Sequence, residues 1–258
     1  MSQDVLLDIK DLAVEFSAHG ARLQALRGID LTLLPGQFHA LVGESGAGKT
    51  VTAFTILRLL PDSARVVRGS LLFQDHDLLS MSGDVLRNLR GREISMIFQE
   101  PSKYLNPSMR ASHQVMESVR FHLGYSDKAA YEHTRDLFVK VGLPADRAAL
   151  ARYPHEFSGG MRQRLMIAMA IACTPSLLIA DEPTTALDVG TQRQIIGLLQ
   201  KIRRESGMAL LYVTHNISVV KYAADYISIM YAGKIIESAP KDILFAQPMH
   251  PYTRLLLA

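Results

Sequence analysis

The chain has 258 residues, of which 48 % are hydrophobic and 21 % charged, which is typical of a globular protein able to bury a large core. Its formal net charge is only +3, whereas nucleic-acid-binding proteins usually carry a concentrated basic stripe, so we do not expect nucleic acid as a partner. One cysteine, Cys173, excludes an internal disulfide and argues against a cysteine-based metal cluster.

The sequence shows neither a targeting segment nor a membrane span. No basic segment followed by an apolar stretch stands near its start, and its apolar runs fall short of the ~18 residues that cross a bilayer. We find no internal repeat and no low-complexity tract. We therefore expect a cytosolic protein, or one held at a membrane by a partner.

The first part of the chain predicts β structure. Over residues 5–40, apolar side chains alternate with polar ones on either side of a register break at Lys10-Asp11, and a turn at Pro35-Gly36 follows. Phe38–Val42 predicts a short apolar strand that runs directly into a glycine-rich loop. After this loop we expect a helix over Thr50–Leu60, stopped by the proline that follows it.

The middle of the chain changes character. Ile94–Phe98 predicts another strand, whereas prolines and glycines separate amphipathic stretches over about residues 102–157, which we interpret as a helical insertion forming its own lobe. After the insertion, the pattern predicts a buried helix over Arg162–Ala172 and a second helix over Val189–Glu205. Central strands are predicted at Leu177–Ala180 and Leu210–Val213, and a β-hairpin over Tyr226–Glu237.

Strands that alternate with helices after a glycine-rich loop predict an α/β fold with a mainly parallel sheet. In such sheets, ligands bind at the carboxyl ends of the strands. Gly43, Gln99, Asp181 and His215 each stand just past the end of a predicted apolar strand. Because four polar motifs converge on one edge in this interpretation, we expect a ligand site there.

The glycine-rich loop matches the phosphate-binding pattern G-x-x-x-x-G-K-[ST] at every required position. Its glycines let backbone N–H groups point at a phosphate chain, and the next helix adds its positive N-terminal end. We expect Lys49 to hold the β- and γ-phosphates of a nucleotide and Thr50 to bind Mg²⁺. The expected nucleotide-binding residues of this loop are Gly43, Glu44, Ser45, Gly46, Ala47, Gly48, Lys49 and Thr50.

Two acidic residues end the apolar strand Leu177–Ala180. Asp181 suits a magnesium ligand, bound directly or through water. Glu182 would then stand beside the γ-phosphate, where it could polarise an attacking water as general base. The alternative is an ordinary acidic helix cap before Pro183, which the phosphate loop upstream makes less attractive.

Ser158, Gly159 and Gly160 precede the predicted buried helix, an arrangement suited to binding phosphate at a helix N-terminus. The chain already has one phosphate loop, so a second anion site makes sense if it serves the nucleotide of another subunit. The alternative is a serine cap followed by a flexible turn.

Three further residues depend on this context. His215, at a strand end, could hydrogen-bond the γ-phosphate and sense its loss. Gln99 lies where the predicted helical insertion begins, so contact with Mg²⁺ or the attacking water would let it act as a two-state switch. Phe16 could stack on adenine, or it could equally be a core aromatic of the N-terminal sheet.

The order of these motifs resembles that of the ATP-binding-cassette (ABC) ATPases along essentially the whole chain. Gly43–Thr50, Gln99, Ser158–Gln163, Leu177–Pro183, Ala186-Leu187-Asp188 and Thr214-His215 look like the Walker A motif, Q-loop, signature, Walker B motif, D-loop and switch histidine of that family. Met161 departs from the glutamine most often found there, at a tolerant position.

The resemblance implies one P-loop NTPase domain over residues 1–258, with an N-terminal antiparallel β subdomain and the inserted helical subdomain. It also implies a head-to-tail dimer, in which the signature and Asp188 of one cassette meet the ATP held by the other. A kinase or GTPase would leave Ser158–Gly160 unexplained. A soluble ABC ATPase acting on nucleic acid or ribosomes usually carries paired cassettes or a long coiled-coil insertion, which this chain lacks.

A closer resemblance is to the oligopeptide, dipeptide and nickel importer branch of bacteria. It rests on the segments Ile97–Pro101, Leu105–Pro107, Ile179–Val189 and His250–Thr253. The implied partners are two membrane permease subunits, a second ABC ATPase identical or similar to this one, and an extracytoplasmic solute-binding protein, with the cassette peripheral on the cytoplasmic side of the inner membrane. A cysteine-bearing tail common in the branch is not part of this sequence, which fits a short member, a shortened chain or half of a fused protein.

Overall fold

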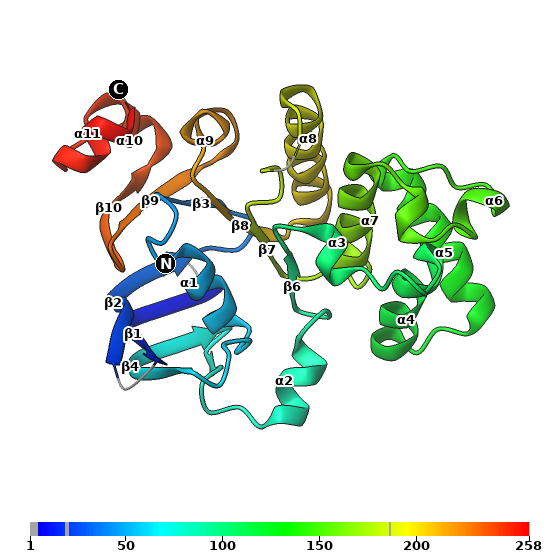
Figure 1. Cartoon of the computed structure of the whole chain (residues 1–258), viewed down its shortest axis with the longest axis horizontal. Coiled ribbons are helices and arrows are strands. Elements are labelled where there is room, and N and C mark those ends of the chain that lie inside the picture. The colour runs from blue at the N-terminus through cyan, green and yellow to red at the C-terminus, as the bar shows by residue number, and fades with distance from the viewer. Residues whose placement is uncertain (1–4, 19–20, 186, 258) are drawn as a thin grey trace. The chain divides into compact units, whose positions relative to one another are not determined.

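A computed structural model describes residues 5–18, 21–185 and 187–257. The chain forms two compact units, which are described separately below (Figure 1). We call Met1–Leu86 together with Ala209–Ala258 the phosphate-loop unit, and Arg87–Met208 the signature unit. The predicted helical insertion, about residues 102–157, falls within the signature unit.

The phosphate-loop unit contains an antiparallel sheet of four strands in the order β2-β1-β4-β5. Its strands are β1 (Leu7–Ala18), β2 (Ala21–Leu33), β4 (Ala64–Phe73) and β5 (His76–Asp77). The predicted register break is a bulge, because the pairing shifts between Ile9 and Leu12 and Asp11 adopts a positive φ of 45°. The N-terminal antiparallel subdomain is therefore confirmed.

Sequence patterning missed strand β4. Most of its first half lies half-buried or exposed, and only Leu71 and Phe73 near its end are buried. A strand that contributes so few side chains to a core lacks the alternation by which strands are predicted. It forms because β1, paired with β2 along one edge, pairs with β4 along its other edge.

A second set of strands in the same unit carries the glycine-rich loop. The strand β3 (Phe38–Val42) is buried at every residue and lies between two parallel neighbours, β8 (Ala209–Thr214) and β9 (Tyr226–Tyr231). The predicted hairpin is confirmed, since β10 (Lys234–Pro240) pairs antiparallel with β9. Its turn, Ala232-Gly233, has positive φ at both residues, as tight hairpins of this kind require.

The helices of the phosphate-loop unit are short. They are α1 (Lys49–Ile56), α9 (Ile217–Ala223), α10 (Lys241–Ala246) and α11 (Pro251–Leu257), while α2 (Gly83–Leu89) leads into the signature unit. Helix α1 ends before the expected Leu60. Arg58 takes the left-handed conformation, with φ 49°, and Leu59 N bonds back to Phe54 O at 2.8 Å, so the backbone closes the helix before Pro61 is reached.

The signature unit contains two parallel strands, β6 (Ile94–Ile97) and β7 (Leu177–Asp181), both buried along their whole length. Its helices are α3 (Pro101–Tyr104), α4 (Ala111–Leu123), α5 (Asp127–Val141), α6 (Arg147–Leu150), α7 (Gly159–Ile171) and α8 (Val189–Ser206). The glycines that punctuate the sequence here, Gly124 and Gly142, are left-handed caps that end α4 and α5. The parallel α/β fold is thus confirmed.

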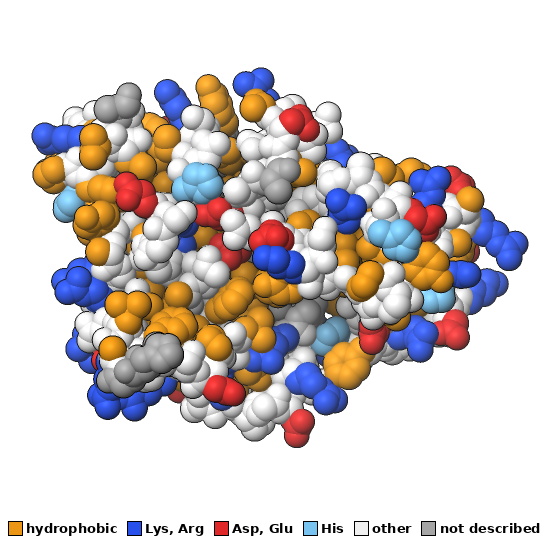
Figure 2. Space-filling model, viewed as in Figure 1, with side chains coloured by type: hydrophobic (Ala, Val, Ile, Leu, Met, Phe, Trp, Pro, Cys, Tyr) orange, Lys and Arg blue, Asp and Glu red, His pale blue; other side chains and the backbone are white. Residues whose placement is uncertain are grey.

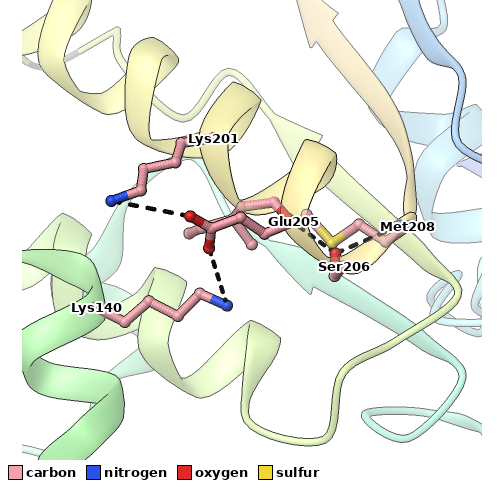
Figure 3. Close-up of polar contacts among 6 residues, drawn as sticks. Lys140, Lys201, Glu205, Ser206 and Met208 are labelled. Carbon is pink, nitrogen blue, oxygen red and sulfur yellow. Dashed lines mark hydrogen bonds and ion pairs between the residues drawn. The ribbon is translucent and has the colours of Figure 1, made fainter.

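Polar contacts near the end of α8 link it to α5 (Figure 3). Glu205 lies 3.5 Å from the Lys140 ammonium of α5 and 3.9 Å from that of Lys201, one turn back on α8. The Ser206 hydroxyl donates to Ile202 O at 2.9 Å and accepts from Met208 N at 3.4 Å as the chain leaves the helix. These ionic groups are largely exposed, so each pair contributes little stability.

In the space-filling view, basic side chains over the signature unit stand among acidic ones (Figure 2). Such mixing agrees with the near-neutral net charge of +3. Within the described ranges, no helix is both long and apolar enough to cross a membrane.

Candidate nucleotide-binding site

The glycine-rich loop joins β3 directly to α1, as the sequence predicts. Gly43 N donates to Thr214 O at 3.3 Å, and Ala47 N donates to Glu44 O at 3.2 Å. A Cβ at Gly43 would lie 2.2 Å from Met230 O, and Gly48 has φ 110° with Ala25 O 2.9 Å from its would-be Cβ. Only glycine fits at these two positions, because backbone atoms of neighbouring strands close in on both.

Lys49 begins α1 and is 4 % exposed. Its ammonium donates to Gly43 O at 2.8 Å and to Glu44 O at 2.9 Å, two carbonyls of the same loop. The Lys49 side chain therefore lies over the glycine-rich loop and is bonded to its backbone. Thr50, in the first turn of α1, is exposed, as are Glu44, Ser45 and Gly46 at the crest of the loop.

The same unit places His215 beside this loop. Strands β3 and β8 are parallel neighbours, with Val42 opposite Thr214, so Gly43 and His215 leave the same edge of the sheet. The His215 side chain is exposed, and Asn216 N bonds Thr214 Oγ1 at 3.0 Å to shape the turn. Two of the four predicted strand-end motifs therefore lie together.

Phe16 lies in the other sheet of this unit, on β1, where it pairs with Leu23 of β2 and Ala64 of β4. Its side chain is half-buried and so does not belong to the fully buried core. Stacking on adenine stays a prediction.

In the signature unit, the two acidic residues end strand β7. Asp181 is the last residue of the strand and 3 % exposed, and Glu182 is 9 % exposed. Glu182 has a positive φ of 45°, a conformation that costs energy in any residue other than glycine and often marks functional sites. The backbone thus turns sharply where the proposed general base stands.

The Glu182 carboxylate has two partners from the signature unit. Gln99 Nε2 donates to Glu182 Oε2 at 3.2 Å, and the Thr185 hydroxyl donates to the same oxygen at 3.0 Å. Ile97 lies opposite Ala180 in the parallel pair, which places Gln99 next to the end of β7. The fold therefore brings together two residues that stand 83 positions apart in the sequence.

Ser158 caps helix α7, and Gly159 and Gly160 are the first two residues of that helix. The helix begins three residues before the predicted start at Arg162. The Ser158 hydroxyl accepts from Met161 N at 3.4 Å. Within the chain, Ser158 therefore acts as a helix cap, as the alternative interpretation of the sequence predicts. Ser158 and Gly159 are exposed, which leaves the helix N-terminus accessible to an anion.

Asp188 caps the neighbouring helix α8 in the same way. Its carboxylate accepts from Thr191 N at 2.9 Å and from the Thr191 hydroxyl at 2.7 Å, and these bonds, the backbone one foremost, lower the pKa of Asp188. A Cβ at Gly160 would lie 3.0 Å from Thr191 Cγ2, so the starts of α7 and α8 are adjacent. Ala186, part of the predicted D-loop, lies outside the described residues.

Sequence reasoning missed three residues that shape these turns. Thr185 holds Glu182, Thr191 holds Asp188, and the Gln192 amide donates to Thr184 O and Leu187 O at 3.0 Å each. The spacing from Asp188 to Thr191 is that of a helix cap, a signal that could have identified Thr191. Nothing in the local pattern indicates the contacts of Gln192.

The comparisons with known proteins agree with this set of motifs. The family model for the ABC transporter matches residues 26–185. The chain is 45 % identical to the oligopeptide transport ATP-binding protein OppD of Bacillus subtilis, over 98 % of this chain and 71 % of that protein. It is 46 % identical to a putative peptide import ATP-binding protein of Brucella ovis, over 100 % of this chain and 78 % of that protein.

The chain belongs to the ATP-binding proteins of ABC transporters. It is an ATPase cassette that binds ATP. The relatives named above do not favour the alternative, a soluble ATPase that acts on nucleic acid or ribosomes. Among solved structures, the cassette is similar to the dimeric ATP-binding cassette MJ0796 bound to ADP and Pi, with a TM-score of 0.81 and 25 % identity over 91 % of this chain and 98 % of that one. The cassette cbiO1 of Clostridium perfringens shows the same fold, with a TM-score of 0.80.

Proposed function

We propose that the cassette hydrolyses ATP to drive the import of peptides through a bacterial ABC transporter. The observation that carries the hydrolytic role is the Glu182 carboxylate, next in sequence to the buried Asp181 and held by Gln99 and Thr185. The names of relatives 45–46 % identical along nearly the whole chain support peptides as the cargo.

In this proposal, Gly43–Thr50 wraps the phosphates of ATP, and Lys49 neutralises the β- and γ-phosphates. Glu182 accepts a proton from the attacking water as general base. His215, at the same sheet edge as the loop, senses the γ-phosphate, and Phe16 stacks on adenine.

The residues proposed to bind a magnesium ion carry the kind of atoms that this ion prefers. Thr50, Asp181 and Gln99 offer a hydroxyl, a carboxylate and an amide oxygen, the hard oxygen ligands that Mg²⁺ prefers. The ion would neutralise charge that develops on the phosphate oxygens during transfer. Because Gln99 also holds Glu182, its orientation would link the metal to the general base.

We further propose that two cassettes form a head-to-tail dimer around ATP. Ser158, Gly159, Gly160 and Asp188 of one cassette would meet the nucleotide held by the other. This arrangement is supported by the exposure of Ser158 and Asp188, which lie at two adjacent helix N-termini. The dimeric state of the similar cassette MJ0796 also supports this arrangement.

The proposed transporter contains two membrane permeases, which hold the cassette at the cytoplasmic face of the inner membrane, and an extracytoplasmic solute-binding protein. We expect a short cytoplasmic helix of a permease to rest on the helical lobe. A groove of about 760 Å³ there supports this expectation, because Met109, Met116, Phe121 and Tyr125 line it together with polar residues. Phe121 is 52 % exposed and Tyr125 41 % exposed, as apolar contact sites often are.

A mixture of two variants tests the shared site. In a head-to-tail dimer of one Lys49→Ala chain and one Ser158→Arg chain, one nucleotide site carries both lesions and the other carries neither. ATP-dependent dimerisation should therefore return in the mixture although each variant alone fails, as size-exclusion chromatography can measure. Ser126→Arg is the matched control, because Ser126 also caps a helix of the signature unit. Normal dimerisation and turnover by Ser158→Arg alone would overturn the proposal.

Cargo needs its own experiment. With both permeases and the second ATPase in liposomes and the solute-binding protein added, ATP-driven uptake of labelled oligopeptides should occur and should stop in Glu182→Gln. Uptake of nickel complexes without uptake of peptides would contradict the peptide assignment while leaving the ATPase assignment intact.

A further inference from the structure

Arg164 of helix α7 bonds two other helices of the signature unit, and the proposed function leaves it without a role. Its Nη1 donates to Val141 O at 2.6 Å, and its Nη2 donates to Gln194 Oε1 at 3.0 Å. Val141 is the last residue of α5, and Gln194 lies in the second turn of α8. One half-buried side chain therefore joins three helices of this unit.

The bond to Gln194 lies one turn beyond the contact between the starts of α7 and α8. Gly160 stands four residues before Arg164 on α7, and Thr191 stands three residues before Gln194 on α8. Residues at these spacings share one face of a helix. A Cβ at Gly160 would lie 3.0 Å from Thr191 Cγ2, so the same two helix faces meet at both levels. The bond therefore helps to fix the spacing between the two helix starts.

The bond to Val141 reaches the end of α5. The last carbonyls of a helix lack partners within the helix and attract positive charge. Gly142, which follows, is a left-handed cap with φ 74°, and a Cβ there would lie 2.9 Å from Arg164 Nη1. Glycine thus permits both the cap and the close approach of the guanidinium. Because α5 belongs to the helical lobe, Arg164 also attaches the lobe to the signature helix.

An arginine suits this junction better than a lysine would. The guanidinium is planar and holds its donors in a fixed fork, so it can bond acceptors on two helices at once. Both acceptors are uncharged, a backbone carbonyl and an amide oxygen, so the side chain supplies direction as well as charge. Lysine has a single nitrogen and would keep the charge without holding both helices.

We propose that Arg164 is a positioning residue for the shared nucleotide site: it holds the starts of α7 and α8 at the spacing at which Ser158 and Asp188 can meet the partner's nucleotide. This inference rests on the proposed head-to-tail dimer. Arg164 does not touch the nucleotide in this account. A preset spacing means that less ordering is needed when two cassettes close on ATP, so the junction should strengthen the closed dimer rather than the binding of ATP to one chain.

The test compares Arg164→Lys with Arg204→Lys in the full chain, both in the Glu182→Gln background in which the ATP-bound dimer should accumulate. The control makes the same change at an arginine whose Nε donates to Gln200 O, one turn back in its own helix, at 3.3 Å. By analytical ultracentrifugation, Arg164→Lys should raise the dissociation constant of the dimer about 10-fold, a factor of about 3 for each of its two shared sites. The control should not change it. Equal dissociation constants in the two variants would overturn the proposal.

A merely structural loosening is excluded by two further measurements. Equilibrium dialysis with labelled ATP, below the concentration at which the chains dimerise, should give the same ATP affinity for Arg164→Lys and for the control. Adding Gln194→Glu to Arg164→Lys should recover most of the lost dimer affinity, because lysine and carboxylate can pair between α7 and α8. No recovery, or weaker binding of ATP by the separate chains, would show that Arg164 does not act through this spacing.

Ser158→Arg separates this inference from the proposal on which it rests. If Ser158→Arg abolishes ATP-dependent dimerisation while Arg164→Lys matches its control, the shared site stands and the positioning role fails alone. If Ser158→Arg dimerises normally, the shared nucleotide site is wrong, and the role of Arg164 in it falls as well.

Discussion

Two glycines of the phosphate loop, Gly43 and Gly48, lie in different surroundings from the two glycines of the signature. Gly43 and Gly48 are buried and enclosed, with backbone oxygens of Met230 and Ala25 at 2.2 Å and 2.9 Å from their would-be Cβ atoms. Gly159 is exposed, and the nearest atom to its would-be Cβ is 4.0 Å away, while Gly160 meets only a Thr191 methyl at 3.0 Å.

This difference separates two glycines that the fold of the chain itself requires from glycines that it leaves open to other molecules. The fold of this chain already demands glycine at Gly43 and Gly48, whatever their role in binding. The fold makes no comparable demand at Gly159, where alanine would fit and would also suit a helix better. A requirement for glycine there would have to come from another molecule, as a shared nucleotide site predicts.

The largest expected effect lies at Glu182. Glu182→Gln keeps the size of the side chain and can still bond Thr185, but it removes the general base. ATP hydrolysis should fall by about 10²–10⁴-fold, with ATP binding retained, and the ATP-bound dimer should accumulate because turnover no longer reopens it. Phosphate release and size-exclusion chromatography measure the two outcomes. Hydrolysis by Glu182→Gln near the wild-type rate would show that Glu182 is not the general base.

The strand that carries the phosphate loop should be sensitive to acid. His39 of β3 is buried beside Ser228, 2.8 Å from its hydroxyl, and burial lowers the pKa of His39 to about 4 from an ordinary 6.5, partly opposed by the Thr32 backbone. Below pH 6.5 the unfolded chain takes up this proton before the folded chain does, so stability is present above pH 6.5 and is lost as pH falls toward 4. The loss amounts to about 3 kcal/mol when the shift is converted at 1.36 kcal/mol per unit.

His39→Gln should flatten this part of the pH dependence, because an amide cannot be protonated in that range. Urea titrations at pH 7, 6, 5 and 4.5 give the free energy of unfolding at each pH. The same slope in both proteins would show that His39 is not the group responsible.

Lys49→Ala should act on nucleotide binding rather than on turnover alone. It removes a buried ammonium that bonds Gly43 O and Glu44 O, and with it the cation proposed to meet the phosphates. The expected loss in ATP affinity is about 10- to 100-fold, as for hydrogen bonds to charged groups. Calorimetry is the suitable measurement because the chain has no tryptophan to report binding. An unchanged dissociation constant for ATP would show that the glycine-rich loop is not the nucleotide site.

The smallest effects give the most direct test of the comparison. Gly43→Ala should lower the free energy of unfolding by about 1–3 kcal/mol, since its methyl group would overlap Met230 O. Gly159→Ala should leave stability unchanged or slightly higher, yet weaken ATP-dependent dimerisation. Thermal or urea unfolding supplies the first comparison and chromatography the second. Destabilisation by Gly159→Ala equal to that by Gly43→Ala would abolish the distinction between the two sets of glycines.

Patterns within a few residues of each other predicted much of the molecule. The register break at Lys10-Asp11, the buried strand Phe38–Val42 and the hairpin around Gly233 all follow from alternation, apolar runs and turn residues. The ends of elements were less accurate. Helix α1 stops early through a left-handed Arg58, a conformation that nothing in its side chain indicates.

The sequence by itself determined which chemical groups this protein has and at which strand ends they stand. The phosphate loop, the two carboxylates, the signature serine and the strand-end histidine can each be recognised from the residues next to them in the sequence. Tertiary structure alone decided which of them meet: Gln99 reaches Glu182 across 83 positions, and Thr191 of α8 lies against Gly160 of α7. The reason is physical. Periodicity records how one segment buries its own side chains, whereas a contact between distant segments depends on how several segments pack at once.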